Sequence, residues 1–411
     1  MPRRQPANSH PRFFDLLFDA LFRYFGAATP REKLVLVLAI AVVLGYAELL
    51  LIMEFKYHAW ILDGRGRPLV RDFAAFWTAG HEALSGRAHA AYNPALQHAA
   101  EVALIGRPYS GMLGWSYPPI FLFAAAALAV LPYAASFVVW CLVTALFQAG
   151  VVASIAGRRS AFVLALAAPW ALIDIWIGQN GLLTAALVGL VLLYLEHKPL
   201  TSGLLLGALS YKPQFGVLFP LALAAAGYWR AFGWAALGVV AMNGLAGLVF
   251  GFDTFSGFFG IIGFTGQTHL NGGVEWRKLQ SIYALARALG SAGPLATAAQ
   301  ICCSVGAGAA VAWSWHTKIA YTRKAALLGA ALPLVTPYVF VYDLPVLAIA
   351  LAFLYRERPF DRVELALLAA TAPLLFLYSA VPFPTALGAN LAVVAMVGRR
   401  FYGELYLLSR R

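Results

Sequence analysis

Asp72 is the residue of this chain whose type and position most clearly suggest chemistry. It lies in the first long polar stretch, which follows an apolar run that is long enough to cross a membrane. A carboxylate there lies at the membrane surface, where it could act as a general base on the head of a lipid-borne molecule. The structural alternative is a helix cap, because Asp is favoured at helix N-termini and a helix is expected to begin at Phe73. Ala75 stands where a capping box would need Glu or Gln, and the sequence leaves both interpretations open.

Lys212, between Tyr211 and Pro213, interrupts an apolar stretch that is expected at membrane depth. A lysine at the centre of a membrane helix costs roughly 2.5–3.5 kcal/mol on insertion scales, so its ammonium is expected to face an anion or a water-filled cavity. A lipid phosphate would suit it. The alternative is a lysine whose ammonium extends to the interface, and we favour the anion.

A dense group of charged and amide residues surrounds Trp276. Arg277 and Lys278 together could clamp a phosphate or pyrophosphate leaving group. Glu275 and Gln280, beside them, are candidates for contacts with a sugar or an acceptor. For each of these residues the alternative is the solvated face of a helix.

Four further residues are candidates for sugar or acceptor binding, namely Tyr117, Gln179, Asn180 and Asp343. The amides of Gln179 and Asn180 suit sugar hydroxyls, although a simple turn between helices would also explain the sequence Gly178-Gln179-Asn180. Asp343 could instead pair with a Lys or Arg, which is the usual arrangement for an acid at membrane depth.

No metal or disulfide motif stands out. Four histidines share the first polar stretch at spacings that match no metal template, and three cysteines lie in apolar runs: His58, His81, His89, His98, Cys141, Cys302 and Cys303. We therefore expect no metal site and no cofactor.

The elements that must position these residues are membrane helices. The chain of 411 residues is 61% hydrophobic and only 12% charged, and its mean hydropathy is +0.74. It holds many runs near membrane-spanning length and lacks the alternation of a membrane barrel. This composition predicts an all-α fold, a polytopic transmembrane helix bundle without a large soluble domain.

We expect about twelve spans from the lengths of the apolar runs. They lie at residues 34–55, 134–157, 160–177, 180–196, 200–211, 213–228, 231–252, 293–315, 323–341, 343–355, 361–380 and 384–398. The run 118–131 is short and is expected to enter the membrane without crossing it, and the pair around Lys212 could form a broken hairpin.

The formal charge of +12 falls in short basic clusters between the apolar runs, which is a signal of topology and not of nucleic-acid binding. With a cytoplasmic N-terminus, and with 118–131 not crossing, every cluster lies inside. We therefore expect a basic cytoplasmic segment at 1–33, one transmembrane domain at 34–398 and a cytoplasmic tail at 399–411. The expected location is a bacterial inner membrane, with the working face toward the periplasm.

Two long polar stretches are then external, at residues 56–117 and 253–293. In the first, the apolar residues from Phe73 to Leu84 share one helical stripe, which predicts an interfacial helix along the membrane. The second carries Gly263, Gly266, Gly272 and Gly273, so a mobile loop is expected before a helical segment at 275–289.

Several short motifs follow one another along most of the chain. They are Asp72-Phe73 through Trp77, with Ala83 to Gly86 and Tyr92-Asn93-Pro94; Tyr117-Pro118-Pro119; Gly178-Gln179-Asn180; the Gly203/Gly207 helix that ends in Lys212-Pro213; and Thr336-Pro337 with Tyr342-Asp343. In this order and spacing the chain resembles glycosyltransferase family 87. That group of GT-C membrane glycosyltransferases includes mycobacterial phosphatidylinositol-mannoside mannosyltransferases.

The resemblance implies a GT-C fold and an inverting, metal-independent transfer from a polyprenyl-phosphate-sugar donor on the external face. The first-loop catalytic aspartate of the family corresponds to Asp72. One departure concerns Tyr342-Asp343, where relatives often carry a histidine, and it leaves the role of Asp343 open.

The expected function is the transfer of a hexose, mannose in particular, to a lipid or glycan acceptor. Asp72 would be the general base, and Lys212, Arg277 and Lys278 would bind the donor phosphate. The expected partners are the lipid-linked donor, the acceptor and membrane lipids, with no nucleic acid. The alternatives are a transporter or flippase of lipid-linked sugars, and a non-catalytic membrane scaffold.

Overall fold

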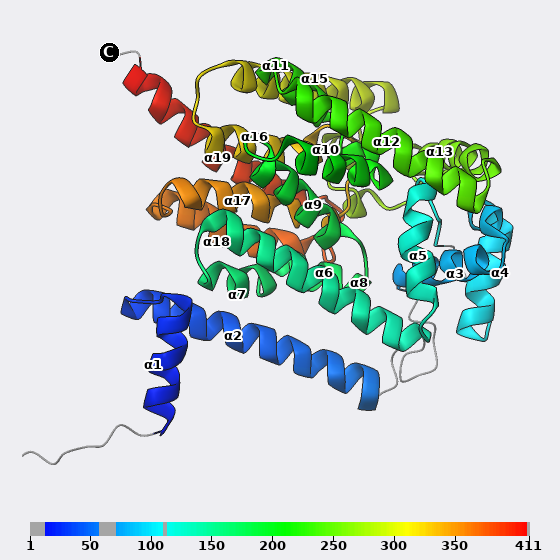
Figure 1. The fold of residues 1–411 in the computed structure, drawn as a ribbon, viewed down its shortest axis with the longest axis horizontal. Helices are drawn as coiled ribbons and strands as arrows, with labels where there is room; N and C mark the ends of the chain where they lie inside the picture. The colour runs from blue at the N-terminus through cyan, green and yellow to red at the C-terminus, as the bar shows by residue number, and fades with distance from the viewer. Residues whose placement is uncertain (1–12, 57–70, 110–112, 409–411) are drawn as a thin grey trace, which may run out of the picture.

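The computed structural model of this chain describes residues 13–56, 71–109 and 113–408 (Figure 1). Within these ranges the regular elements are all helices, and the β-structure is limited to one isolated bridge between Leu279 and Phe340. The prediction of an all-α bundle is confirmed.

The α-helices are, in chain order, α1 (Phe13–Phe25), α2 (Pro30–Leu51), α3 (Phe73–Leu84), α4 (Pro94–Ile105), α5 (Leu122–Ala129), α6 (Tyr133–Ala156), α7 (Ser160–Leu166), α8 (Pro169–Ile177), α9 (Gly181–Tyr194), α10 (Pro199–Ala208), α11 (Leu218–Ala226), α12 (Trp229–Phe250), α13 (Asp253–Leu270), α14 (Ile282–Ala288), α15 (Gly293–His316), α16 (Tyr321–Ala331), α17 (Val346–Glu357), α18 (Arg362–Leu377) and α19 (Ala386–Leu408). A π-helical turn, η1 (Ile52–Lys56), extends α2. The short 3₁₀ turns are η2 (Ala88–Tyr92), η3 (Pro119–Phe121), η4 (Leu209–Tyr211), η5 (Pro213–Phe215), η6 (Trp276–Lys278), η7 (Leu332–Leu334) and η8 (Val341–Asp343).

In the described part of the chain, four helices are long and apolar enough to cross a membrane. They are Pro30–Glu54, α6, α12 and α15, and the pair α7 and α8, bent by 50°, makes a fifth if it is one span. Other predicted runs form shorter apolar helices, among them Gly181–Tyr194 and Pro213–Ala226. The break between α10 and α11 falls at Lys212-Pro213, where proline cannot continue the helix.

The long helices expose apolar side chains, such as Leu44 on α2, Val240 on α12 and Val305 on α15. Such a surface would be unfavourable in water and is favourable in hydrocarbon. The chain is a multi-pass membrane protein.

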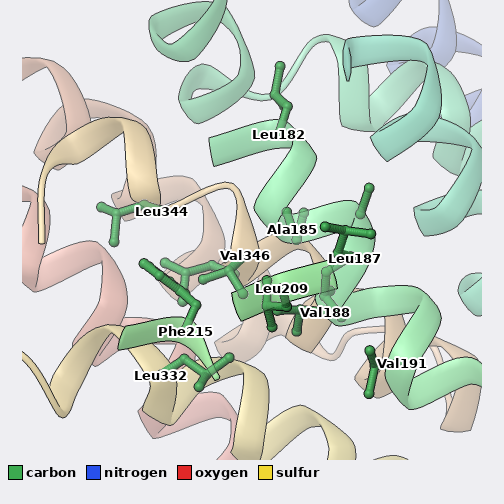
Figure 2. Packing of buried hydrophobic residues seen from close by; sticks show 14 of the residues in the cluster. Leu182, Ala185, Leu187, Val188, Val191, Leu209, Phe215, Leu332, Leu344 and Val346 are labelled. Atoms are coloured by element: carbon green, nitrogen blue, oxygen red, sulfur yellow. The ribbon is translucent and has the colours of Figure 1, made fainter. Parts of the chain in front are cut away.

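The core of the bundle is formed around α9 and α17 (Figure 2). Leu182, Ala185 and Val188 of α9 are fully buried, and Leu209 and Val346 pack in the same cluster. Helices α9 and α17 both begin close to this cluster. The loops that precede them are therefore attached to a well-packed part of the bundle.

Helices α3, α4, α5 and α13 lie together at one end of the molecule, and α1 and the last turns of α19 lie toward the other (Figure 1). The apolar stripe of α3 is largely covered, since Phe73 and Phe76 are buried. Gly80 lets α3 cross α5 closely, because a Cβ there would lie 2.0 Å from the carbonyl oxygen of Ala125. The expected mobile loop before residue 275 is wrong: α13 continues to Leu270 and includes two of the glycines, because packing overrides low helix propensity.

Candidate active site

A cavity of about 710 Å³ opens where α3, α8, α13, η5 and η8 meet. Its walls include six of the ten residues that the sequence singles out: Asp72, Tyr117, Gln179, Lys212, Lys278 and Asp343. Residues from six distant parts of the chain therefore share one space.

Asp72 stands at the N-terminal boundary of α3 without acting as its cap. Its backbone is helical, with φ −57° and ψ −24°, and its side chain makes no capping hydrogen bond. Instead, its Oδ2 accepts a hydrogen bond of 2.9 Å from Nε2 of Gln179. The carboxylate is therefore directed to the cavity wall. The sequence left a helix-capping role open, and in the structure Asp72 does not cap α3.

The Gly178-Gln179-Asn180 turn reaches Asp72 because Gly178 has no side chain. Its φ of +75° lies in the left-handed region, and a Cβ there would lie 2.7 Å from Cβ of Phe73. The turn thus packs directly on the first residue of α3, which places the side chain of Gln179 beside Asp72.

The amide of Gln179 is oriented by two donors. Its Oε1 accepts hydrogen bonds from the hydroxyl of Tyr117 at 3.0 Å and from the backbone N–H of Asn180 at 3.2 Å. Its Nε2 must then face the carboxylate of Asp72. Tyr117 and Gln179 form a relay that fixes one oxygen of Asp72, and among the described residues none is seen to donate to the other oxygen.

The surroundings of Asp72 raise the pKa of its carboxyl above the ordinary value. Burial is the main cause, and the negative charge of Asp343 adds to it. The hydrogen bond from Gln179 and the positive charge of Lys278 act in the opposite direction. A carboxylate with a raised pKa is a stronger base than an ordinary aspartate, which is what proton abstraction from a hydroxyl needs.

Lys212 is buried and has an anion beside it, as the sequence suggested, but that anion is Asp343. The ammonium forms an ion pair with the Asp343 carboxylate and donates to Oδ1 of Asn180 at 2.6 Å. The second oxygen of Asp343 accepts from the backbone N–H of Phe340 at 2.9 Å. Lys212 therefore lines the cavity with its charge balanced by Asp343. Two of its three N–H donors have these partners, and the third is available for a ligand.

Of the charged residues near Trp276, Lys278 alone is part of the cavity wall. Arg277 binds Glu275 at 2.5 Å and donates to the carbonyl of Ser379 at 2.6 Å, so it ties this segment to the end of α18. Lys278 is half-exposed and lies 3.5 Å from Glu275. Arg277 and Glu275 lie outside the wall.

Gln280 and Asn180 are buried and serve as supports. The backbone N–H of Gln280 donates to the carbonyl of Val339 at 2.6 Å, and its Oε1 accepts from the N–H of Leu387 at 3.2 Å. The pairing of 279–280 with 339–340 brings Lys278 to the same rim as Asp343. Neither Gln280 nor Asn180 lines the cavity.

The sequence did not mark Arg71 and Glu54 as candidates for the site. They form an ion pair in which both side chains are buried, and the Arg71 guanidinium lies 4.7 Å from the ring of Phe137 and 5.1 Å from that of Trp176. This pair joins the π-helical end of α2 to the residue before Asp72. An acid in the last turn of an apolar run was the available signal, because such residues are usually paired.

His269 was also missed, because its segment was expected to be a loop. It lines the cavity from α13, and its ring centroid lies 5.8 Å from that of Phe340 and 5.9 Å from that of Tyr338. Burial lowers the pKa of this imidazole. Among the described residues, no group of three or more His, Cys, Asp or Glu side chains could hold a metal ion.

The model of glycosyltransferase family 87 matches residues 115–337, more than half of the chain. The match includes Tyr117, Gln179, Lys212 and Lys278, and Asp72 lies before it. Comparison with the curated proteins and with the solved structures found no match.

Proposed function

Because the chain belongs to glycosyltransferase family 87, we propose that it transfers a hexose, mannose in particular, from a polyprenyl-phosphate-sugar donor. The acceptor is a lipid or a glycan, and the reaction takes place at the periplasmic face of a bacterial inner membrane. Membership of the family makes the chain a glycosyltransferase; the donor, the sugar, the mechanism and the sidedness are our proposal.

One observation carries this proposal. A carboxylate that does not cap its helix, Asp72, is held by Gln179 in the wall of a cavity that also contains Lys278 and the Lys212–Asp343 pair. A base facing cations across one space suits the attack of a hydroxyl on a sugar whose leaving group is a phosphate.

In the proposed reaction, the acceptor hydroxyl attacks the anomeric carbon while the free oxygen of Asp72 takes its proton. The bond between the anomeric carbon and the phosphate oxygen breaks, and the phosphate leaves with the electron pair. Lys278 and the remaining N–H of Lys212 stabilise the charge that develops on that oxygen. A single displacement inverts the anomeric carbon, and Asp72 afterwards releases its proton to water.

The rim of the cavity supports a donor with a lipid tail. Pro213 and Ile262 line the cavity and are exposed. Exposed apolar residues follow or precede them closely in the chain, such as Val217 and Phe259. Lys278 is the charged and exposed part of the wall. The lipid tail of the donor would lie in the bilayer beside the apolar part of the rim, and its phosphate would lie near Lys278.

The test is Asp72→Asn, which keeps the size of the side chain and removes its basicity. Transfer of radiolabelled mannose from polyprenyl-phosphate-mannose by purified protein in lipid nanodiscs should fall roughly 10²–10⁴-fold. The matched control is Asp253→Asn, because Asp253 is exposed in the first turn of α13, outside the cavity wall.

Full transfer by a correctly folded Asp72→Asn protein would overturn the role of Asp72. If the wild-type protein moves lipid-linked sugar across vesicles and forms no transfer product, the transporter alternative replaces the proposal.

A further inference from the structure

The first helix of the described chain lies at the N-terminal end of α2, toward the end of the molecule opposite α3 and α13 (Figure 1). Helix α1 (Phe13–Phe25) is rich in apolar residues, and its charged residues Asp19 and Arg23 stand four positions apart. Such spacing puts the polar residues of a helix on one narrow stripe. A helix of this kind has apolar surface to bury on nearly every other side.

Helix α1 cannot continue into α2. Gly26 has a φ of +69°, and Thr29 begins α2 with a reciprocal capping box to Glu32. Pro30 follows as the first residue of α2. The chain therefore turns at 26–29, and Figure 1 shows α1 directed away from the axis of α2. Since α2 is long and apolar enough to span a membrane, a helix that leaves its axis in this way would run along the membrane surface.

The C-terminal half of α1 is fixed to the bundle. Phe22 and Phe25 pack on a small buried cluster that contains Leu36 of α2 and Val163 of α7. The guanidinium of Arg159 lies 4.7 Å from the ring of Tyr24. The orientation of α1 is therefore set by contacts with two helices.

Two rings of α1 keep exposed surface in the described structure, although Phe18 stacks on Phe22 and Tyr24 lies beside Arg159. Phe18 is 44% exposed and Tyr24 is 61% exposed. The apolar residues Leu34 and Leu38 at the start of α2, which must contact lipid, are exposed to a similar degree. The same lipid surface would therefore cover both helices.

The charges around α1 favour an anionic surface. Arg23, Arg31, Arg158 and Arg159 are exposed at this end of the molecule. Among the nearby acids, Asp19 is exposed, and Glu32 is bound by its own cap and lies 3.8 Å from Arg158. The excess is positive, as it is in segments that bind acidic headgroups.

We propose that α1 is an interfacial helix that inserts Phe18 and Tyr24 into the leaflet at this end of the molecule and binds acidic phospholipid headgroups through the surrounding arginines. This anchor is independent of the sugar transfer proposed above. It would fix the height of α2 in the bilayer and hence the depth of the Glu54 end, which pairs with the residue before Asp72.

The test measures the depth of single spin labels in the full-length protein. Cys302 and Cys303 are replaced with alanine, and buried Cys141 is kept. Nitroxides are attached through Phe18→Cys or Asp19→Cys, and the protein is placed in vesicles of phosphatidylcholine with phosphatidylglycerol. Collisions with oxygen, which concentrates in lipid, are compared with collisions with a water-soluble nickel complex. Leu38→Cys on α2 provides the lipid-exposed reference.

The label at 18 should follow the Leu38→Cys reference, and the label at 19 should prefer the nickel complex. Equal access of nickel to both labels would overturn the proposal, because α1 would then lie in water. Protection of the label at 18 from both reagents would also overturn it, since a second copy of the chain would then cover the helix.

The acidic lipid is tested with vesicles of phosphatidylcholine alone. The label at 18 should become shallower without phosphatidylglycerol, and this dependence should be lost in the double variant Arg23→Gln, Arg31→Gln. A depth that does not change with phosphatidylglycerol would overturn the headgroup part of the proposal. The double variant retains Arg159 and the apolar contacts of α1, so it should remain folded.

Discussion

At the scale of single residues, the orientation of Asp72 is set by another side chain and not by its own helix. Tyr117 donates to Gln179, and Gln179 donates to Asp72, at 3.0 and 2.9 Å. A hydrogen bond to a carboxylate stabilises the charged form, so this relay also limits how far burial raises the pKa of Asp72.

This relay predicts the effect of Gln179→Leu on the pH profile. Without the donor, the pKa of Asp72 rises further, because burial is no longer opposed by the hydrogen bond. Since the base acts only when deprotonated, the acidic limb of kcat/KM should move to higher pH.

The measurement is kcat/KM for sugar transfer from pH 4 to 9, with Gln267→Leu as the control on the exposed face of α13. A Gln179→Leu profile that keeps the acidic limb of the wild type and only loses rate would contradict the relay.

The Lys212–Asp343 pair shows a second principle at this scale. A buried lysine without a partner would be unfavourable, and Asp343 supplies the compensating charge from 131 residues away. The pair joins the break between α10 and α11 to the turn before α17. The pair is therefore a structural link between these segments. The remaining N–H of Lys212 is in addition a candidate contact for the phosphate.

At the scale of elements, glycines decide which segments can meet. Gly181, the first residue of α9, would bring a Cβ to 1.7 Å from the carbonyl oxygen of Tyr342. Backbone cannot be displaced cheaply at that distance, so α9 and the η8 turn pack only because residue 181 has no side chain. The side chain of Asp174 accepts hydrogen bonds from the same N-terminal turn, at 3.1 and 3.3 Å.

We expect Gly181→Ala to separate α9 from η8 and thereby to pull Asp343 away from Lys212. The yield of monodisperse protein in detergent and the thermal unfolding temperature should both fall, and transfer activity should be lost. Gly233→Ala is the matched control, since a Cβ at that position in α12 would meet no atom within 4 Å and alanine favours the helix. Equal unfolding temperatures for the two variants would contradict the close packing.

In the molecule as a whole, α3 and α13, which line the cavity, lie at one end of the bundle, and α1 lies toward the other (Figure 1). The arrangement separates the proposed sugar chemistry from the basic clusters near Arg158 and Arg323. The positive-inside rule predicts a cytoplasmic location for such clusters.

The two ends should therefore react differently with a thiol reagent that cannot cross membranes. In spheroplasts of cells that express the Cys302→Ala, Cys303→Ala background, Ser85→Cys after α3 should be labelled. Arg362→Cys at the start of α18 should be labelled only after the membrane is permeabilised. Labelling of Arg362→Cys in intact spheroplasts would reverse the proposed topology, and with it the periplasmic location of the cavity.

The all-α membrane class and the family could be predicted from the sequence, because both depend on local information: the length of apolar runs and the order of short motifs. The sequence also singled out Asp72, Lys212 and Gln179, because charged or amide residues are conspicuous beside apolar runs. The number of spans stays a prediction, since run length alone does not separate a crossing helix from a short broken one.

The contacts of these residues could not be predicted in this way and became clear only from the folded chain. Folding pairs Lys212 with Asp343, turns Gln179 toward Asp72, places Arg277 outside the cavity and brings His269 into it. Each of these outcomes depends on distances between segments that are far apart in the chain. Such distances are set by the packing of helices around α9 and α17, at positions such as Gly178 and Gly181 where one added carbon would move the elements apart.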